Sequence, residues 1–193
     1  MSGPARTPQN SDMQNDLLTA DAPPGSLNPV VMPQRTRFDG RVETGKEEWL
    51  TPPEIVKALG PFDLDPCAPI KRPWPTAANH YTIEDNGLIK PWHGRVWLNP
   101  PYGTETGKWM RRMKEHGNGI VLIFARTETQ TFFECVWGVA TACLWLKGRL
   151  TFYNVDGTKP KYSGGAPSVL IAYGEQNADR LRTCELAGRV TAA

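Results

Sequence analysis

The chain has 193 residues, 39% of them hydrophobic, and a formal net charge of +2 at pH 7. This length and apolar fraction suffice for one folded domain with a sizeable core, and so small a charge does not by itself indicate nucleic-acid binding. The four cysteines form no CxxC pair, which argues against a disulfide framework and against a zinc site: Cys67, Cys135, Cys143 and Cys184.

Apolar runs in the sequence are all too short to span a bilayer, and the N-terminus lacks the apolar core of a secretion signal. We therefore expect a cytoplasmic protein that makes no membrane contact. The three histidines, His80, His93 and His116, lack the spacing of metal ligands, and no metal site is expected.

Residues 1–42 are rich in Pro, Ser, Asn and Gln, and their few apolar residues show no period, so we predict a disordered N-terminal tail. The folded domain is expected over residues 43–176. Residues 177–193 are expected to form a C-terminal extension that is helical or frayed.

The first half of this domain shows turn signals between short apolar segments. Thr51 is a suitable N-cap for a helix that ends before Gly60. The elements predicted here are a helix over Pro53–Leu59, a strand over Pro61–Asp65, an irregular stretch over Pro66–Tyr81, a turn over Glu84–Leu88 and a strand over Arg95–Leu98.

The second half alternates helical patterns with apolar runs. The elements predicted there are helices over Thr106–Glu115 and Thr131–Val139 and strands over Gly119–Phe124, Ala142–Leu146 and Ser168–Tyr173. This alternation predicts an α/β fold whose mostly parallel sheet is covered on both faces. The segments around Phe152 and Val169 are close enough in sequence to form a C-terminal antiparallel hairpin.

The motif Asn99-Pro100-Pro101-Tyr102 follows the apolar run Val96–Leu98, where a buried strand opens into a loop. Loops of this kind carry active sites in α/β sheets. Asn99 offers an amide oxygen, Pro100 offers a carbonyl on a stiff backbone, and Tyr102 offers a ring for stacking. Two acceptors and a ring suit a planar substrate with an exocyclic NH2 group. The alternative is an ordinary Pro-Pro turn.

Three further motifs are candidates for ligand contacts. Asp63 and Asp65 alternate with apolar residues before a Pro-Cys-Ala loop, which places both carboxylates on one face or simply marks a solvated strand end. Trp49-Leu50-Thr51-Pro52 is either a packed helix start or a site for a ligand carboxylate. Asp85-Asn86-Gly87-Leu88 is either an ordinary turn or a contact for an adenine edge.

Cationic side chains occur in two places near these motifs. Arg126 and Thr127 follow the strand Gly119–Phe124, where they form either a capped helix start or a wall of the substrate site, with Arg126 on a phosphate or the target base. Lys108, Arg111 and Arg112 lie on one predicted helix and form either phosphate contacts or a solvated cationic face.

These motifs, taken in order, resemble the phage-type (Dam-like) DNA N6-adenine methyltransferases over roughly residues 47–174. The segments that carry the resemblance are 48–52, 62–68, 84–88, 99–102, 125–129, 147–152 and 166–170. The resemblance implies a Rossmann-like methyltransferase domain over 43–176 that uses S-adenosylmethionine and acts on an adenine flipped out of duplex DNA. Phage origin and a link to restriction–modification are further implications, and no obligatory protein partner is inferred.

Site residues follow from the resemblance position by position. Asn99 and the Pro100 carbonyl would hold the adenine N6 atom, Tyr102 would stack on the base, and Pro101 completes the catalytic motif. The cofactor would lie against Trp49, Thr51, Asp63, Asp65, Pro66, Cys67, Asp85 and Asn99. DNA would contact Lys108, Arg111, Arg112, Arg126, Thr127 and Arg149.

Two alternatives stay open, and one departure from related enzymes bears on both. Pro66-Cys67-Ala68-Pro69 stands where many methyltransferases carry a glycine-rich loop. A methyltransferase that acts on RNA or on a protein glutamine amide uses the same acceptor chemistry, although the glutamine enzymes usually keep that loop. A catalytically dead DNA-binding decoy is the second alternative.

Overall fold

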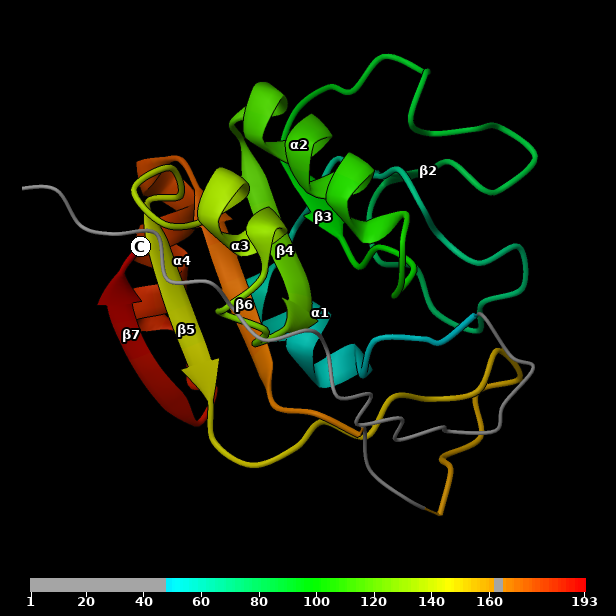
Figure 1. Ribbon diagram of the computed structural model, residues 1–193. Helices are drawn as coiled ribbons and strands as arrows, with labels where there is room; N and C mark the ends of the chain where they lie inside the picture. Colours follow the sequence, from blue (N-terminus) through cyan, green and yellow to red (C-terminus); the bar gives the residue numbers. More distant parts are fainter. Residues whose placement is uncertain (1–47, 162–164) are drawn as a thin grey trace, which may run out of the picture. The chain divides into compact units, whose positions relative to one another are not determined.

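The structure is a computed structural model that describes residues 48–161 and 165–193, shown in Figure 1. All of these residues belong to one contact unit, which spans residues 40–193. The expected disordered tail, 1–42, and the expected start of the folded part at Glu43 lie outside the described residues.

Seven strands of the described chain form one sheet in the order β2-β1-β3-β4-β6-β5-β7. Their bounds are β1 Leu64–Asp65, β2 Asn79–His80, β3 Val96–Leu98, β4 Gly119–Phe124, β5 Ala142–Leu146, β6 Ser168–Tyr173 and β7 Gly188–Ala192. Strand β1 pairs in parallel with β2 and β3, and β3 pairs in parallel with β4. Strand β6 is antiparallel to both β4 and β5, and β7 is antiparallel to β5. Strands β1 to β5 therefore run one way, and β6 and β7 run the other way.

Helices cover both faces of this sheet (Figure 1). Their bounds are α1 Pro53–Leu59, α2 Thr106–His116, α3 Gln130–Cys135 and α4 Glu175–Thr183. Side chains alternate along β4, so Val121 and Ile123 pack with α2 and α3 while Ile120 and Leu122 pack with α1 and α4. A strand buried on both faces reads as a continuous apolar run, which is why β4 and β6 were visible in the sequence.

Several elements confirm the sequence predictions. Helix α1 and strands β4, β5 and β6 have the predicted bounds, and the α/β class with a mostly parallel arrangement is present. Helix α2 extends one residue further than expected, to His116, and ends at Gly117, whose φ of 70° is a left-handed conformation that glycine adopts without strain.

The predicted C-terminal hairpin around Phe152 and Val169 is wrong. Strand β6 lies between β4 and β5 instead, where its six buried residues face apolar neighbours on both sides of the sheet. The segment around Phe152 contributes only an isolated antiparallel bridge between Tyr153 and Leu50, held by two backbone hydrogen bonds of 2.9 Å. This bridge brings the chain after β5 beside the segment that precedes α1.

Other boundaries differ for local reasons. Thr51 is not the N-cap of α1, because the helix is preceded by Pro52 and has no side-chain cap. Strand β1 starts at Leu64 rather than at Pro61. The Asp63 side chain accepts from the Arg95 N–H at 2.6 Å. Helix α3 starts at Gln130, capped by Thr129, and ends at Cys135, before the left-handed Gly138.

Strands β2 and β7 were not predicted. Strand β2 lies in the stretch expected to be irregular, and Asn79 N donates to Asp63 O at 2.9 Å. Strand β7 lies in the segment 177–193, which was expected to be helical or frayed and which also contains most of α4. Both strands lie at the edges of the sheet and carry few apolar residues, so no alternating pattern reveals them.

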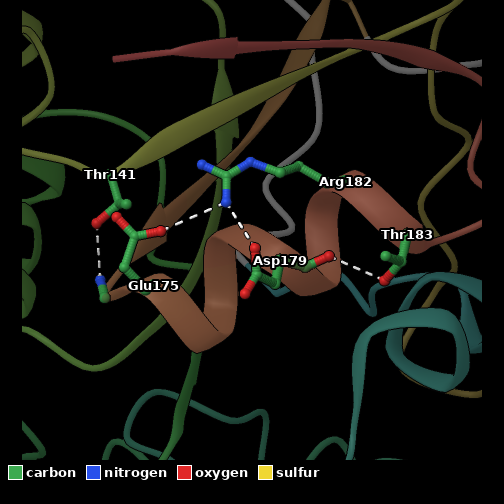
Figure 2. A network of polar contacts seen from close by, with 6 residues as sticks. Thr141, Glu175, Asp179, Arg182 and Thr183 are labelled. Atoms are coloured by element: carbon green, nitrogen blue, oxygen red, sulfur yellow. Dashed lines mark hydrogen bonds and ion pairs between the residues drawn. The ribbon is translucent and has the colours of Figure 1, made fainter.

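Helix α4 is tied to the sheet at its start, as Figure 2 shows. The Gly174 N–H donates to the Thr141 hydroxyl at 3.0 Å, next to the first residue of β5. Along the helix, Arg182 pairs with Asp179 at 2.6 Å and with Glu175 at 3.4 Å. These exposed pairs each contribute little, so the helix is stabilised mainly by its buried Ala178 and Leu181.

Candidate active site

A cavity of about 380 Å³ lies at the carboxyl ends of the neighbouring parallel strands β1 and β3. Strand β1 ends at Asp65, and Asn99 directly follows β3. The lining also includes Thr51 from the segment before α1, Asn86 from the turn after β2 and Tyr102 from the loop after β3. The carboxyl edge of parallel strands is where ligands bind in open α/β sheets, and a cavity of this volume suits a small-molecule ligand.

The motif Asn99-Pro100-Pro101-Tyr102 forms the wall on the β3 side. Asn99 is half-buried and Pro100 is buried, while Pro101 and Tyr102 are exposed. The Tyr102 hydroxyl donates to Asn99 Oδ1 at 3.4 Å, a long and therefore weak hydrogen bond. The Thr106 hydroxyl donates to Pro101 O at 2.7 Å and fixes the end of the loop to the start of α2.

Aromatic rings hold Tyr102 in place. Its ring stacks on Phe124 with a centroid distance of 4.1 Å and an interplanar angle of 16°. Phe152 meets the same ring edge-on at 6.2 Å. The last residue of β4 and a residue of the chain after β5 therefore support the ring, which is still 37% exposed.

Asp65 is the buried carboxylate of the cavity and is only 3% exposed. One oxygen accepts from the Thr76 hydroxyl, and the other accepts from the Cys67 N–H at 3.1 Å. Burial raises the pKa of this carboxyl to about 6, although the two hydrogen bonds and the nearby Arg72 lower it in part. At neutral pH the group is therefore mostly ionised, and it places a negative charge in the wall.

Cys67 connects the two walls. Its thiol donates to the backbone oxygen of Asn99 at 3.2 Å, so the loop after β1 is bonded to the loop after β3. Burial, together with the neighbouring Asp65 carboxylate, raises the pKa of the thiol well above its usual value. The sulfur therefore stays protonated and keeps its proton for this bond.

The segment before α1 forms another side of the cavity through Trp49 and the buried Thr51. The Thr51 carbonyl accepts from Trp74 Nε1 at 3.1 Å, which anchors this segment to the proline-rich chain after β1. Pro66 also lines the cavity. The structure thus brings together most of the residues expected to touch a cofactor, namely Trp49, Thr51, Asp65, Pro66, Cys67 and Asn99.

Two expected cofactor residues lie outside the cavity lining. The Asp63 carboxylate is exposed and accepts from the Arg95 N–H, so it does not line the cavity beside Asp65. Asp85 accepts from Thr82 N and from Lys90 Nζ, each at 2.9 Å, and these bonds lower its pKa to about 2. The turn that contains Asp85 does reach the cavity, but through Asn86 and Gly87.

Sequence reasoning missed several lining residues. Thr76 lies in the stretch expected to be irregular, and no motif distinguishes it from its neighbours. Trp97 lies in a predicted strand and Trp109 in a predicted helix, and neither was named as a candidate site residue, yet both border the cavity. A lining tryptophan has no sequence signal of its own, because burial in a core and burial in a wall require the same residue type.

The predicted DNA-contacting cations fall into two classes, and none lines the cavity. The three predicted DNA-contacting cations on α2 each have an acidic partner: Lys108 with Glu105, Arg111 with Glu134 and Arg112 with Glu115. Arg126 and Arg149 are exposed and have no ion pair within residues 48–161 and 165–193. Thr127 is half-buried, and its carbonyl accepts from Trp137 Nε1 at 3.3 Å.

Across the described segments, no group of three or more His, Cys, Asp or Glu side chains is placed to hold a metal ion. None of the helices described is long and apolar enough to cross a membrane.

Comparison with known proteins assigns the chain to a family. No curated protein matches it, and no solved structure matches it. The sequence model of the family described as DNA N-6-adenine-methyltransferase (Dam) matches residues 41–186, which is well over half of the chain and includes both walls of the cavity. The chain therefore belongs to the Dam family of DNA N-6-adenine-methyltransferases.

Proposed function

We propose that the chain transfers a methyl group from S-adenosylmethionine to the N6 atom of an adenine in duplex DNA. One observation carries the proposal: the Asn99 motif and the buried Asp65 carboxylate end neighbouring parallel strands and face one cavity. Family membership supports the reaction and the DNA substrate.

The cavity fits S-adenosylmethionine by its chemistry. The cofactor carries a sulfonium cation and a ribose with two hydroxyls, and a buried carboxylate such as Asp65 attracts the first and accepts from the second. The half-buried Trp49 supplies an aromatic wall, which suits both a cation and a planar adenine. When bound, S-adenosylmethionine supplies the methyl group.

The loop after β3 provides the acceptor side of the reaction. Asn99 Oδ1 and the Pro100 carbonyl accept the two hydrogens of the adenine N6 group. This arrangement directs the nitrogen lone pair toward the methyl donor and stabilises the positive charge that develops on N6. The weak bond from the Tyr102 hydroxyl to Asn99 Oδ1 is readily exchanged for the bond to N6. No strong base is needed before attack.

The target base must leave the helix to reach this loop, since N6 is paired inside the duplex. Tyr102, which is 37% exposed beside the cavity, provides a ring on which the flipped adenine stacks. The single strand β6 inserted antiparallel between β4 and β5 is consistent with a Rossmann-like methyltransferase sheet. A cytoplasmic location, phage origin and a place in restriction–modification stay predictions.

The proposal is tested with S-adenosylmethionine that carries a labelled methyl group. The protein is incubated with unmethylated duplex DNA, RNA or a glutamine-containing protein, and the DNA is digested to nucleosides. We expect label in N6-methyldeoxyadenosine. Label in RNA or protein alone would replace the DNA substrate with one of those acceptors. Absence of binding heat with S-adenosylmethionine in calorimetry would favour the decoy.

A further inference from the structure

The peptide group that joins Asn99 to Pro100 lies between the two proposed acceptors of the N6 hydrogens. Its orientation affects both of them, since the Asn99 side chain branches off before this peptide and the Pro100 carbonyl follows it. The proline nitrogen carries no hydrogen. Asn99 O is therefore the only polar atom of this peptide that a hydrogen bond can hold.

Cys67 supplies that hydrogen bond. The thiol donates to Asn99 O at 3.2 Å, and no other group in the described part of the chain donates to this oxygen. Cys67 is itself fixed on the opposite side, because its N–H donates to Asp65 Oδ1 at 3.1 Å. A short chain of hydrogen bonds thus runs from the buried carboxylate through Cys67 to the peptide between the acceptors.

The state of the thiol agrees with this arrangement. Only a protonated sulfur can donate to a carbonyl, and burial with the adjacent Asp65 carboxylate raises the pKa of Cys67 well above its usual value. The same residue is therefore unsuited to act as a nucleophile, which requires the thiolate.

We propose that Cys67 is a positioning residue, whose thiol holds the Asn99–Pro100 peptide plane so that Asn99 Oδ1 and Pro100 O converge on the substrate amino group. This inference rests on the proposed function. Cys67 acts through the acceptor loop and does not itself contact the reacting atoms. Its removal should therefore slow the chemical step much more than it weakens the binding of S-adenosylmethionine.

The test compares Cys67→Ala, Cys67→Ser and a matched control. We expect Cys67→Ala to lower kcat for DNA methylation on the order of tenfold, because small misplacements of reacting groups are costly. The Kd for S-adenosylmethionine, measured by calorimetry, should rise much less than kcat falls, since the Asp65 carboxylate and its bond from the residue 67 N–H remain. Cys67→Ser keeps a donor with a shorter reach and should recover most of the lost rate.

The control is Cys184→Ala. Cys184 is also half-buried, and its thiol also donates to a backbone oxygen, that of Leu181 at 3.3 Å, but it lies next to α4 and away from the cavity lining. Its kcat should match that of the wild type. Where Cys67→Ala lowers the thermal stability strongly, Cys67→Val replaces it, because valine fills the space of the thiol without a donor.

Four results would overturn the inference. Wild-type kcat in both Cys67→Ala and Cys67→Val would show that the bond does not matter for the reaction. If Cys67→Ser is no faster than Cys67→Ala, or if cofactor affinity and kcat fall in parallel, the role of Cys67 is to pack the cavity wall and not to hold the peptide. A wild-type protein that binds S-adenosylmethionine without methylating DNA would instead overturn the proposed function, and this inference with it.

Discussion

The end of β1 and the first residues after it are largely buried and bonded within the fold, whereas the loop after β3 opens to solvent. Asp65 is 3% exposed and accepts two hydrogen bonds, while Tyr102 is 37% exposed and donates one weak bond to Asn99. Both loops border the same cavity. Under the proposed function this difference suits two ligands: the buried, charged wall would hold the small cofactor, and the open, aromatic wall would admit a base from DNA.

Among the variants of the two walls, Asn99→Ala should have the largest effect on activity. This variant removes one of two acceptors that stabilise the positive charge on N6. The kcat should therefore fall about 10²- to 10³-fold, the loss seen when other enzymes lose one preorganised polar group that stabilises a transition state. Binding heat with S-adenosylmethionine should persist, because the Asp65 wall is intact. Labelled methyl transfer measures the rate.

Asn79→Ala is the matched control for this variant. Asn79 is exposed on the edge strand β2, outside the cavity lining, and its side chain makes one bond, to Asp63 O at 3.1 Å. Its activity should equal that of the wild type. Full activity in Asn99→Ala, with the same thermal stability as the control, would contradict the assignment of the acceptor.

Tyr102 distinguishes stacking from hydrogen bonding on the open wall. Tyr102→Ala removes the ring, and loss of a base–aromatic stack costs about 1–3 kcal/mol, or roughly 5- to 150-fold in KM for DNA. Tyr102→Phe keeps the ring and loses only the 3.4 Å bond to Asn99, so its KM should stay close to the wild-type value. Equal effects of the two substitutions would show that the hydroxyl, and not the ring, is what matters.

Asp65→Asn tests the buried wall. Removing the negative charge should weaken S-adenosylmethionine binding about tenfold, with little change in KM for DNA. The adjacent Asp63→Asn variant is the control, because Asp63 is exposed and bonded to the Arg95 N–H outside the cavity lining. Calorimetry on both variants shows whether the loss of affinity for S-adenosylmethionine is specific to the Asp65 carboxylate or follows from removing any negative charge.

The same carboxylate gives a pH dependence. Burial raises the pKa of Asp65 to about 6 in the folded protein, so the group is charged above that pH and neutral below it. Affinity for the sulfonium cofactor should be greatest at about pH 8 and decline as the pH falls through about 6 toward about 5. Asp65→Asn should show a much flatter profile, and an unchanged slope in this variant would assign the pH dependence to another group.

The sequence revealed the two walls unequally. Asn99 was found because it follows an apolar run, and Asp65 because it ends a segment in which acidic and apolar residues alternate. Strand ends at one edge of a parallel sheet lie close together. Thr76 was not found, because it reaches Asp65 only through the fold of a proline-rich stretch without periodicity. Asp63 shows the opposite case. Its spacing from Asp65 predicted that both carboxylates share one face of the strand, but the Asp63 carboxylate accepts from a backbone N–H 32 positions away and lies outside the cavity lining.

The fold shows the same division between local and long-range information. Bounds of β4, β5 and β6 follow from their continuous apolar runs. Their order does not, because three such runs present similar surfaces and the pairing depends on contacts distant in the chain. Short edge strands such as β2 have almost no apolar signal, so only backbone hydrogen bonds in the folded protein define them.

The smallest expected effect concerns which side of the molecule DNA approaches. Arg126 lies two residues after Phe124 and Arg149 three residues before Phe152, the two rings that contact Tyr102. Both arginines are exposed and without an ion pair in the described chain, whereas Lys108 and Arg111 on α2 are already paired with glutamates. A paired cation must give up its carboxylate before it can bind a phosphate, so the unpaired ones should contribute more to DNA binding.

Two double variants with the same change in charge test this contrast. Arg126→Gln with Arg149→Gln should weaken DNA binding about 3- to 10-fold and reduce the slope of log K against log salt by about 2, as expected for the loss of two phosphate contacts. Lys108→Gln with Arg111→Gln should change both quantities much less. Fluorescence anisotropy over a range of salt concentrations measures them. If the α2 pair has the larger effect, DNA crosses α2, and the open side of the cavity is reached from there.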